Sequence, residues 1–223
     1  MADLLLLGGL SDMSTTIYFQ EVVKKHRNRF ERVIVVSFPF DKMETLRKAA
    51  GFRDIAAEFD EVIDRTQSED LTVAICSNTY NQAVQFMRHS AKVFRIDQAV
   101  VATAKALELS TVYILATSAT VGSAYYNSLF LATGIQTIVP SEEDQVEVDR
   151  VIYEELCMAS FPPNSFDSIL RIIRRSEVNV ILLGCTELTY FADRLRERGF
   201  VVLDSTMIHI QSLEINSAER AGG

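Results

Sequence analysis

The sequence predicts an α/β fold built on mostly parallel sheets, and two observations support this prediction. Eight short runs rich in Leu, Ile and Val are spaced along the 223 residues, with amphipathic stretches between most of them. Most of these runs are apolar without alternation, which is typical of parallel strands that are buried on both faces. The change from strand to helix and back indicates an α/β fold rather than an all-helical or all-strand one.

Each expected element has a place on the chain. Strands are expected at residues 3–7, 32–37, 71–76, 92–95, 111–116, 136–139, 178–183 and 200–203. Helices are expected at residues 14–29, 55–64, 81–89, 98–109, 123–132, 142–158, 165–176 and 187–198. Pro162 and Pro163 end the helix before them, and Asn164 can cap the next one.

An internal repeat divides this succession into two lobes. Residues 72–79 resemble residues 180–187, because in each segment a buried strand ends in small polar residues and a helix follows. Ser77 and Cys185 lie 108 residues apart, and the first strand has a similar counterpart at nearly the same offset. Similar strands recur at some spacing in any α/β protein, but two segments at one offset favour a duplication. We therefore expect two pseudo-symmetric lobes, residues 1–97 with 205–223 packing back on them, and residues 98–204, with the active site in the cleft between them.

The composition excludes several classes of protein. With 48% apolar and 23% charged residues, the chain is expected to fold rather than to stay disordered. Its formal net charge of -8 argues against nucleic acid as a partner, because phosphate contacts need a basic face. No run approaches the roughly 18 apolar residues of a membrane span, and the start lacks the basic leader of a secretory signal. We expect a cytoplasmic protein without membrane contact.

Four of the expected strands end in small polar clusters. In open α/β sheets, ligands bind beyond the carboxyl ends of the strands, near helix N-termini. Backbone amides with Ser, Thr and Asn side chains suit a carboxylate there, although any one cluster is equally compatible with a helix cap. Four together favour a cleft for a small anion. The clusters are residues 8–11, 77–79, 117–120 and 184–187.

The fingerprints of several other sites are missing from the sequence. G-x-G-x-x-G, G-x-x-x-x-G-K-S/T and G-x-S-x-G do not occur. His26, His89 and His209 are far apart, and no cysteine pair has C-x-x-C spacing. We therefore expect neither a metal nor a cofactor.

The three cysteines are too few for a disulfide framework and raise the question of a working thiol. Cys185 is the strongest candidate, because it follows a buried strand through one glycine and opens the next helix. A helix N-terminus favours the thiolate, so we expect a lowered pKa for Cys185. Cys157, inside a predicted helix, is expected to be a small apolar filler. The role of Cys76 stays open, because strand neighbours point to opposite faces and Ser77 is the residue expected to face the cleft.

Four ordered motifs now carry a family resemblance. Residues 8–15 read G-G-L-S-D-M-S-T, residues 77–79 read S-N-T, residues 184–187 read G-C-T-E, and residues 204–209 read D-S-T-M-I-H. Together, and with Tyr18 also fitting, they resemble the motifs of the aspartate/glutamate racemase superfamily. Glu187, where glutamate racemases carry histidine, favours the aspartate racemase-like branch. The motifs span residues 8–209, nearly the whole chain.

The resemblance implies racemisation of an amino acid without a cofactor, by two residues that flank the substrate Cα. One removes the proton and the other protonates the opposite face, while hydrogen-bond donors stabilise the developing enediolate. By position, the catalytic pair is Cys185 and Ser77, and Glu187 receives the α-amino group or orients Cys185. The α-carboxylate would be held by Ser11, Asn78, Thr79, Thr117, Thr120 and Thr186. The resemblance also implies a homodimer.

The sequence departs from the family at the first catalytic position, where Ser77 stands in place of cysteine. A hydroxyl is a far poorer base than a thiol but can still donate a proton. We therefore expect Cys185 to deprotonate an L-amino acid and Ser77 to reprotonate it, with a kinetic bias from L to D. Loss of the cysteine does not by itself imply loss of racemase-type activity.

The substrate is expected to be an acidic amino acid, aspartate or glutamate. A cation that would grip its side-chain carboxylate is not evident; Lys42 is the nearest, with Arg47 and Arg53 as further candidates, and each is typical of a solvated surface charge. Two alternatives stay open: a one-thiol decarboxylase or related isomerase of the same superfamily, and a non-catalytic amino-acid-binding relative.

Overall fold

The chain forms two compact units in the computed structural model, which describes residues 2–9, 11–26 and 28–220. The first unit comprises Met1–Ile96 and His209–Gly223, and the second comprises Asp97–Ile208. Leu10 of the first polar cluster, Arg27 of the first expected helix and residues 221–223 of the expected first lobe lie outside the described residues.

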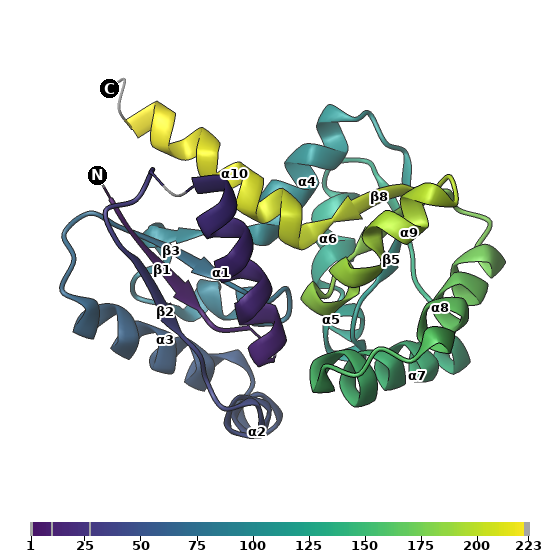
Figure 1. The fold of residues 1–223 in the computed structure, drawn as a ribbon, viewed down its shortest axis with the longest axis horizontal. Helices are drawn as coiled ribbons and strands as arrows, with labels where there is room; N and C mark the ends of the chain where they lie inside the picture. The colour runs from purple at the N-terminus through teal and green to yellow at the C-terminus, as the bar shows by residue number, and fades with distance from the viewer. Residues whose placement is uncertain (1, 10, 27, 221–223) are drawn as a thin grey trace. The chain divides into compact units, whose positions relative to one another are not determined.

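Each unit contains a four-stranded parallel sheet flanked by helices, which confirms the predicted fold class (Figure 1). The strand order is β2-β1-β3-β4 in the first unit and β6-β5-β7-β8 in the second, so the two sheets have the same connectivity. The strands of the described residues lie at the expected places. They are β1 (Asp3–Leu7), β2 (Val33–Val36), β3 (Leu71–Ile75), β4 (Val93–Phe94), β5 (Thr111–Leu115), β6 (Gln136–Ile138), β7 (Val180–Leu183) and β8 (Val201–Asp204).

The helices connect these strands. They are α1 (Asp12–His26), α2 (Phe40–Ala50), α3 (Phe52–Thr66), α4 (Ile96–Ala106), α5 (Ser118–Gly122), α6 (Tyr125–Leu131), α7 (Glu142–Arg150), α8 (Pro163–Arg175), α9 (Ala192–Glu197) and α10 (Ser205–Arg220). The chain passes from one unit to the other within α4 and within α10. Among the helices described, none combines the length and the apolar character needed to cross a membrane.

The 3-10 and π segments account for most differences from the expected helices. The 3-10 segments are η1 (Tyr80–Phe86), η2 (Ser90–Lys92), η4 (Leu156–Met158) and η5 (Thr186–Phe191), and η3 (Val151–Glu155) is a π segment. Residues 81–89 are therefore not the expected α-helix, and the Asn81 side chain gives one reason. Its amide donates to the carbonyl oxygens of Ile75 and Ser77, and side chains that bond nearby backbone compete with helical hydrogen bonds.

Three further expected helices differ from the observed elements in their bounds or in their type. Residues 123–132 form α6 alone, with α5 before it, and residues 142–158 divide into α7, η3 and η4. Residues 187–198 begin as η5 and continue as α9. The helices α2, α5 and α10 were not expected. Residues 42–50 are good helix formers apart from Thr45, and Pro39 precedes the first residue of α2.

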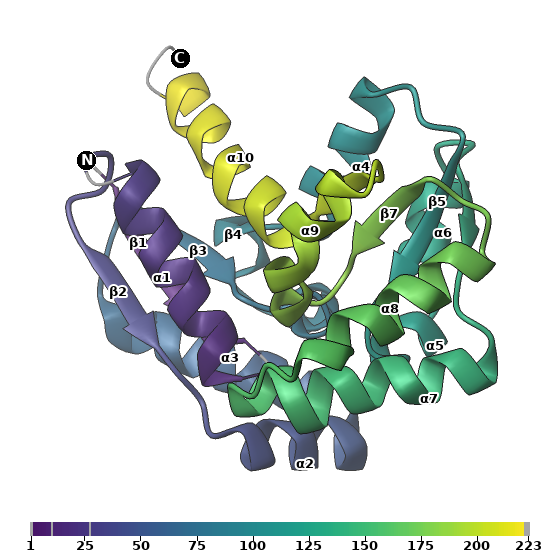
Figure 2. The same ribbon diagram turned by 45° about the vertical axis from the view of Figure 1, so that its right-hand side comes forward.

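The core of the first unit covers both faces of its sheet. Leu4 and Leu6 of β1 pack with Tyr18 and Val22 of α1. Leu5, which points to the opposite face because strand side chains alternate, is also fully buried. In Figure 2 the strands lie between α1 in front and α3 behind. Burial on both faces explains why this strand has no polar alternation.

The second unit builds its core mainly from one helix and two strands. Phe166 and Ile169 of α8 pack with Leu115 of β5 and Leu183 of β7, and all four side chains are fully buried. The helices α7 and α8 lie side by side in Figures 1 and 2, and both contribute to this cluster. The core therefore fixes the two strands whose carboxyl ends carry the polar clusters of this unit.

Gly9 allows two backbone segments of the first unit to approach closely. A Cβ atom at Gly9 would lie 2.0 Å from the carbonyl oxygen of Cys76 and 2.1 Å from Ser14 Oγ, so no side chain fits. Just before this contact, the N–H of Cys76 donates to the carbonyl oxygen of Leu7 at 2.8 Å. The glycine thus keeps the ends of the neighbouring strands β1 and β3 together.

We predict that Gly9→Ala destabilises the protein, because backbone atoms would have to move to admit the methyl group. The expected loss is about 1–3 kcal/mol of the free energy of unfolding, as for overpacking elsewhere. Urea denaturation followed by circular dichroism measures it. Gly122→Ala is the control, since a Cβ there meets no atom within 4 Å. An equal unfolding midpoint for both variants would contradict the packing argument.

Candidate active site

Each unit gathers its predicted site residues at the carboxyl ends of two adjacent strands. Those of the first unit follow β1 and β3, and those of the second follow β5 and β7; these strands pair directly. The serine cluster consists of Ser11, Ser77, Asn78 and Thr79, and the cysteine cluster of Thr117, Thr120, Cys185, Thr186 and Glu187. Every side chain of both clusters is buried, with at most 7% of its surface exposed.

Ser11 caps α1 and shapes the turn after β1. The N–H of Ser14 donates to Ser11 Oγ at 3.2 Å, and Ser14 Oγ donates to the carbonyl oxygen of Ser11 at 2.7 Å. Thr15 Oγ1 accepts from the N–H of Gly9 at 3.2 Å. The glycine, serine and threonine residues of this motif thus bond to one another and fix the loop. Such a cap satisfies N–H groups at the start of the helix.

Ser77 is held by hydrogen bonds that leave its own proton available. Its Oγ accepts from the N–H of Tyr80 at 3.2 Å, and its carbonyl oxygen accepts from the Asn81 amide at 2.7 Å. Asn81 Oδ1 in turn accepts from the N–H of Ile96. Within the described part of the chain the hydroxyl of Ser77 accepts a hydrogen bond but donates none. A hydroxyl group that is held in place and does not donate its proton to the protein is better suited to protonate a substrate than to act as a base.

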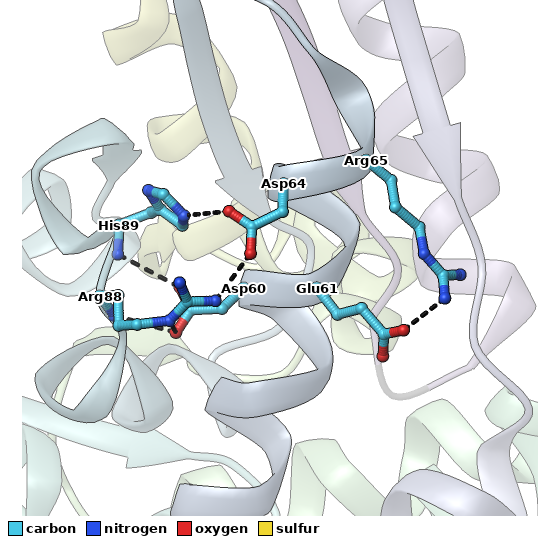
Figure 3. Close-up of polar contacts among 6 residues, drawn as sticks. All are labelled: Asp60, Glu61, Asp64, Arg65, Arg88 and His89. Carbon is cyan, nitrogen blue, oxygen red and sulfur yellow. Dashed lines mark hydrogen bonds and ion pairs between the residues drawn. The ribbon is translucent and has the colours of Figure 1, made fainter.

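The far end of the segment that begins at Ser77 is fastened to α3 by two aspartates (Figure 3). The buried carboxylate of Asp60 accepts from the N–H of Arg88 at 2.9 Å and from the N–H of His89 at 3.2 Å. The side chains of both residues bond to Asp64, each at 2.7 Å. These contacts, together with η1 packing on α3, fix both ends of the segment. The pKa of Asp64 is lowered first by the Arg88 hydrogen bond and then by His89.

Asp60 was not recognised from the sequence, although a signal was present. It lies among the buried positions of α3 with Ile55, Phe59 and Ile63. A carboxylate on the apolar face of an amphipathic helix needs hydrogen-bond donors from outside the helix. Such a residue therefore points to a neighbouring loop that it holds.

In the second unit, α7 holds the turn after β5. Gln145 Nε2 donates to the carbonyl oxygen of Ala116 at 2.9 Å, and Asp149 Oδ1 accepts from the N–H of Ser118 at 2.8 Å. Thr117, between these two anchored residues, is 3.3 Å from Thr120 through the hydroxyl oxygens. The helix thereby fixes two hydroxyl groups of the cysteine cluster.

Cys185 and Glu187 form a thiol–carboxylate pair at the carboxyl end of β7. Cys185 Sγ donates to Glu187 Oε2 at 3.0 Å, and the two side chains are buried, Glu187 completely. Burial in the apolar cluster raises the pKa of the Cys185 thiol well above its usual value, and the negative charge of Glu187 raises it further. The Cys185 thiol therefore stays protonated and donates its hydrogen bond to the Glu187 side chain.

The expected lowering of the Cys185 pKa is thus wrong. The following helix is the six-residue 3-10 segment η5 rather than a longer α-helix. Only aligned peptide units over several turns build the dipole that favours a thiolate. Desolvation and the nearby carboxylate both favour the neutral thiol.

The end of β8 supports the Cys185 turn. Ser205 Oγ donates to the carbonyl oxygen of Leu183 at 2.6 Å, two residues before the cysteine. Thr189 Oγ1 donates to Asp204 Oδ1 at 3.0 Å, which fastens η5 to the same strand end. Burial raises the pKa of Asp204. The first residues of the D-S-T-M-I-H motif therefore fix the loop that carries the thiol.

His209, the last residue of that motif, is structural within the first unit. Its Nε2 lies 2.8 Å from the carbonyl oxygen of Phe94, and its Nδ1 lies 2.8 Å from the Tyr18 hydroxyl. A carbonyl oxygen can only accept, so Nε2 carries the proton and Nδ1 accepts from tyrosine. The histidine thereby joins α10 to α1 and β4.

The other two cysteines lie in packed surroundings. Cys76 is fully buried in the core cluster of the first unit, and burial raises its pKa well above the usual value. Cys157 is partly buried and packs against the apolar cluster that contains Cys185. No group of three or more potential ligands for a metal ion occurs among the residues that the structure describes.

The cations considered for a side-chain carboxylate have other partners. Lys42 pairs with Glu58 at 2.6 Å. Arg47 makes two hydrogen bonds to Glu44, whose carboxylate also accepts from Tyr80. The guanidinium of Arg53 lies over the ring of Phe86, 4.5 Å from its centroid. The contacts described join each of these three cations to a residue outside both clusters.

The family model described as Asp/Glu/Hydantoin racemase matches residues 7–213, and the chain belongs to this family. This confirms the resemblance seen in the motifs and supports an isomerase of the racemase type.

Among solved structures, a Yersinia pestis protein assigned to the Asp/Glu racemases is 24% identical over 98% of this chain and 100% of its own, with a TM-score of 0.80. The aspartate racemase of Picrophilus torridus is 16% identical over 98% and 95%, with a TM-score of 0.78. Glutamate racemase from Francisella tularensis, in complex with D-glutamate, is 16% identical over 99% and 82%, with a TM-score of 0.70. These likenesses establish a shared fold.

We predict that Asp60→Ala destabilises the segment after Ser77, because it leaves two part-buried N–H groups without an acceptor and empties a buried position. The expected cost is about 1–3 kcal/mol of the free energy of unfolding. Faster amide exchange at Arg88 and His89, measured by mass spectrometry, would accompany it. Glu61→Ala removes an exposed contact with Arg65 on the same helix (Figure 3) and should change stability by less than about 0.5 kcal/mol. Equal effects of the two substitutions would refute the anchoring role.

We predict that Glu187→Gln lowers the pKa of the Cys185 thiol, because a negative charge beside it is removed. The pH midpoint of iodoacetamide alkylation at Cys185, followed by peptide mass spectrometry, should shift downward, and more thiolate should form at each pH below the wild-type midpoint. Exposed Glu154→Gln makes the same change in net charge elsewhere in the second unit. The prediction fails if the two variants share one midpoint.

Proposed function

We propose that this protein is a cofactor-independent amino-acid racemase in which Cys185 and Ser77 act on opposite faces of the substrate Cα. The observation that carries the proposal is the buried hydrogen bond from the Cys185 thiol to Glu187. A thiol beside a carboxylate has a partner that can take its proton, which the thiol must lose before it acts as a base. The family of the chain supports the same reaction type.

The proposed reaction begins with a proton transfer inside the cysteine cluster. Glu187 takes the thiol proton, and the resulting thiolate removes the Cα proton of an L-amino acid. The electron pair of the broken C–H bond moves into the α-carboxylate, which becomes an enediolate. Glu187 then returns its proton to solvent.

The second half of the reaction belongs to Ser77. Its free hydroxyl proton passes to the opposite face of Cα and gives the D-amino acid, and water returns a proton to the serine oxygen. Ser77 is a poor base in the reverse direction, which is the physical reason for the proposed asymmetry between the two enantiomers. Hydroxyl and amide donors of both clusters stabilise the enediolate, whose charge is larger than that of the ground-state carboxylate.

The substrate that we propose is aspartate or glutamate, in line with the family description. Because Lys42, Arg47 and Arg53 have other partners, the side-chain carboxylate would be bound by hydroxyl groups and backbone N–H groups. Such groups bind carboxylates well when they lie at strand ends and helix starts.

Deuterium exchange at Cα tests this proposal. Both enantiomers of aspartate and glutamate are incubated separately in deuterated buffer, and deuterium at Cα and chirality are measured by NMR and chiral chromatography. Cys185→Ala should lower the exchange rate by about 100- to 10,000-fold, the usual effect of losing an acid–base group. Cys157→Ala removes a thiol from the same apolar cluster and should retain turnover.

The difference between Cys185 and Ser77 as bases can be detected in the same exchange experiment. The equilibrium constant between enantiomers is unity, so kcat/KM must be equal in both directions. The bias is instead expected in exchange without inversion: the L-substrate gains deuterium at the Cys185 face and returns as L, whereas the D-substrate does not exchange in this way. Equal exchange with retention from both enantiomers would overturn the asymmetric scheme. Carbon dioxide release from substituted malonates, or binding without any exchange, would overturn the racemase itself.

A further inference from the structure

A pocket of about 420 Å³ lies entirely within the second unit and outside both clusters. It is formed where the end of β6, the first turn of α7 and the end of α8 meet the middle of β5. Its volume falls in the range of about 300–1,000 Å³ that is typical of small-molecule sites. A ligand of modest size would therefore fit.

One wall of the pocket is apolar and contains the side chain of a largely buried tyrosine. Ile172 of α8 and the half-exposed Ile138 and Val139 at the end of β6 provide the apolar surface. Tyr113 of β5 also lines the pocket and is only 2% exposed. Among the described residues its hydroxyl has no hydrogen-bond partner. The hydroxyl of this pocket-lining tyrosine can therefore donate to an acceptor group of a ligand.

The Tyr113 hydroxyl stays protonated at neutral pH and can donate to such a ligand. Burial, with a smaller contribution from the carboxylate of Asp144, raises the pKa of Tyr113 to about 12. The neighbouring guanidinium of Arg175 opposes this shift only weakly, as the last contribution.

The rim of the pocket carries charges of both signs. Arg175 at the end of α8 pairs with Asp144 in the first turn of α7, and the exposed carboxylate of Glu143 lies beside them. The arginine is largely exposed, so this ion pair is weak and can open. A ligand with one positive and one negative group can replace each partner of the pair without leaving a charge unmatched.

We propose that this pocket is a second, non-catalytic site for a zwitterionic α-amino acid with an apolar side chain. The ammonium group of the ligand pairs with Asp144 and Glu143, and its carboxylate pairs with Arg175. The Tyr113 hydroxyl donates to the same carboxylate. The side chain packs on Ile138, Val139 and Ile172. An acidic side chain would meet an apolar wall and two carboxylates, so aspartate and glutamate are excluded.

Calorimetric titration of the full chain with L-leucine tests the proposal. Two analogues dissect it: 3-methylbutylamine lacks the carboxylate and 4-methylpentanoate lacks the ammonium group. Leucine should bind at least about tenfold more tightly than either analogue and than L-aspartate, since each charged contact contributes roughly 1.4 kcal/mol or more. Equal binding of leucine and the amine, or no detectable binding of leucine, overturns the proposal.

Substitutions locate the bound leucine. Tyr113→Phe keeps the ring and removes the hydroxyl, and should raise the Kd about tenfold. Arg175→Gln removes the exposed cation and should raise the Kd about two- to fivefold. Arg174→Gln is the matched control, because it alters the adjacent exposed arginine of α8, which does not line the pocket.

Cys185→Ala should leave leucine binding unchanged. Binding that survives the first two substitutions but is lost in Cys185→Ala belongs to the catalytic cluster and overturns the second site. Because Arg175 is exposed, its substitution tests the site even if Tyr113→Phe fails to fold.

Discussion

Parallel pairing of two central strands is the constraint on which each unit depends. In the first unit Leu7 is opposite Ile75, and in the second Leu115 is opposite Leu183, so the paired strands end level with each other. Residues that follow them are then neighbours in space although they are far apart in sequence. Because of this register, the residues that carry the thiol, hydroxyl and amide groups lie together at the strand ends.

The polar residues around these strand ends serve mainly to hold loops. Thr15 bonds to the turn after β1, α7 bonds to the turn after β5, and Asp204 of β8 bonds to η5 after β7. Such contacts keep a few functional groups in place without a metal cluster among the described residues. Loops placed by a rigid scaffold are the usual position for binding and catalytic groups.

The sequence predicted the sheets well because their signal is local. The unalternated apolar runs of the central strands β1, β3, β5 and β7 are mostly buried, as is typical of strands in a covered parallel sheet. The helices were harder where side chains compete with the backbone, as Asn81 does in η1. The motifs identified the cysteine, but its pKa could not be predicted. That value depends on the depth of burial and on the orientation of the Glu187 carboxylate, which are tertiary properties. Asp60 was missed for the same reason, since its partners lie in a distant loop.

The hydrogen bonds described for Ser77 and Cys185 join each of them to residues nearby in the sequence, and this has an evolutionary consequence. Ser77 is fixed by Tyr80 and Asn81, whereas Cys185 is paired with Glu187 only two residues away. A gene duplication that produced two such halves would let each drift under separate selection. The replacement of a thiol by a hydroxyl in one half then leaves unchanged the partner that is close in sequence to the other catalytic residue. An ancestor with two equivalent halves could in this way give rise to descendants with unequal ones.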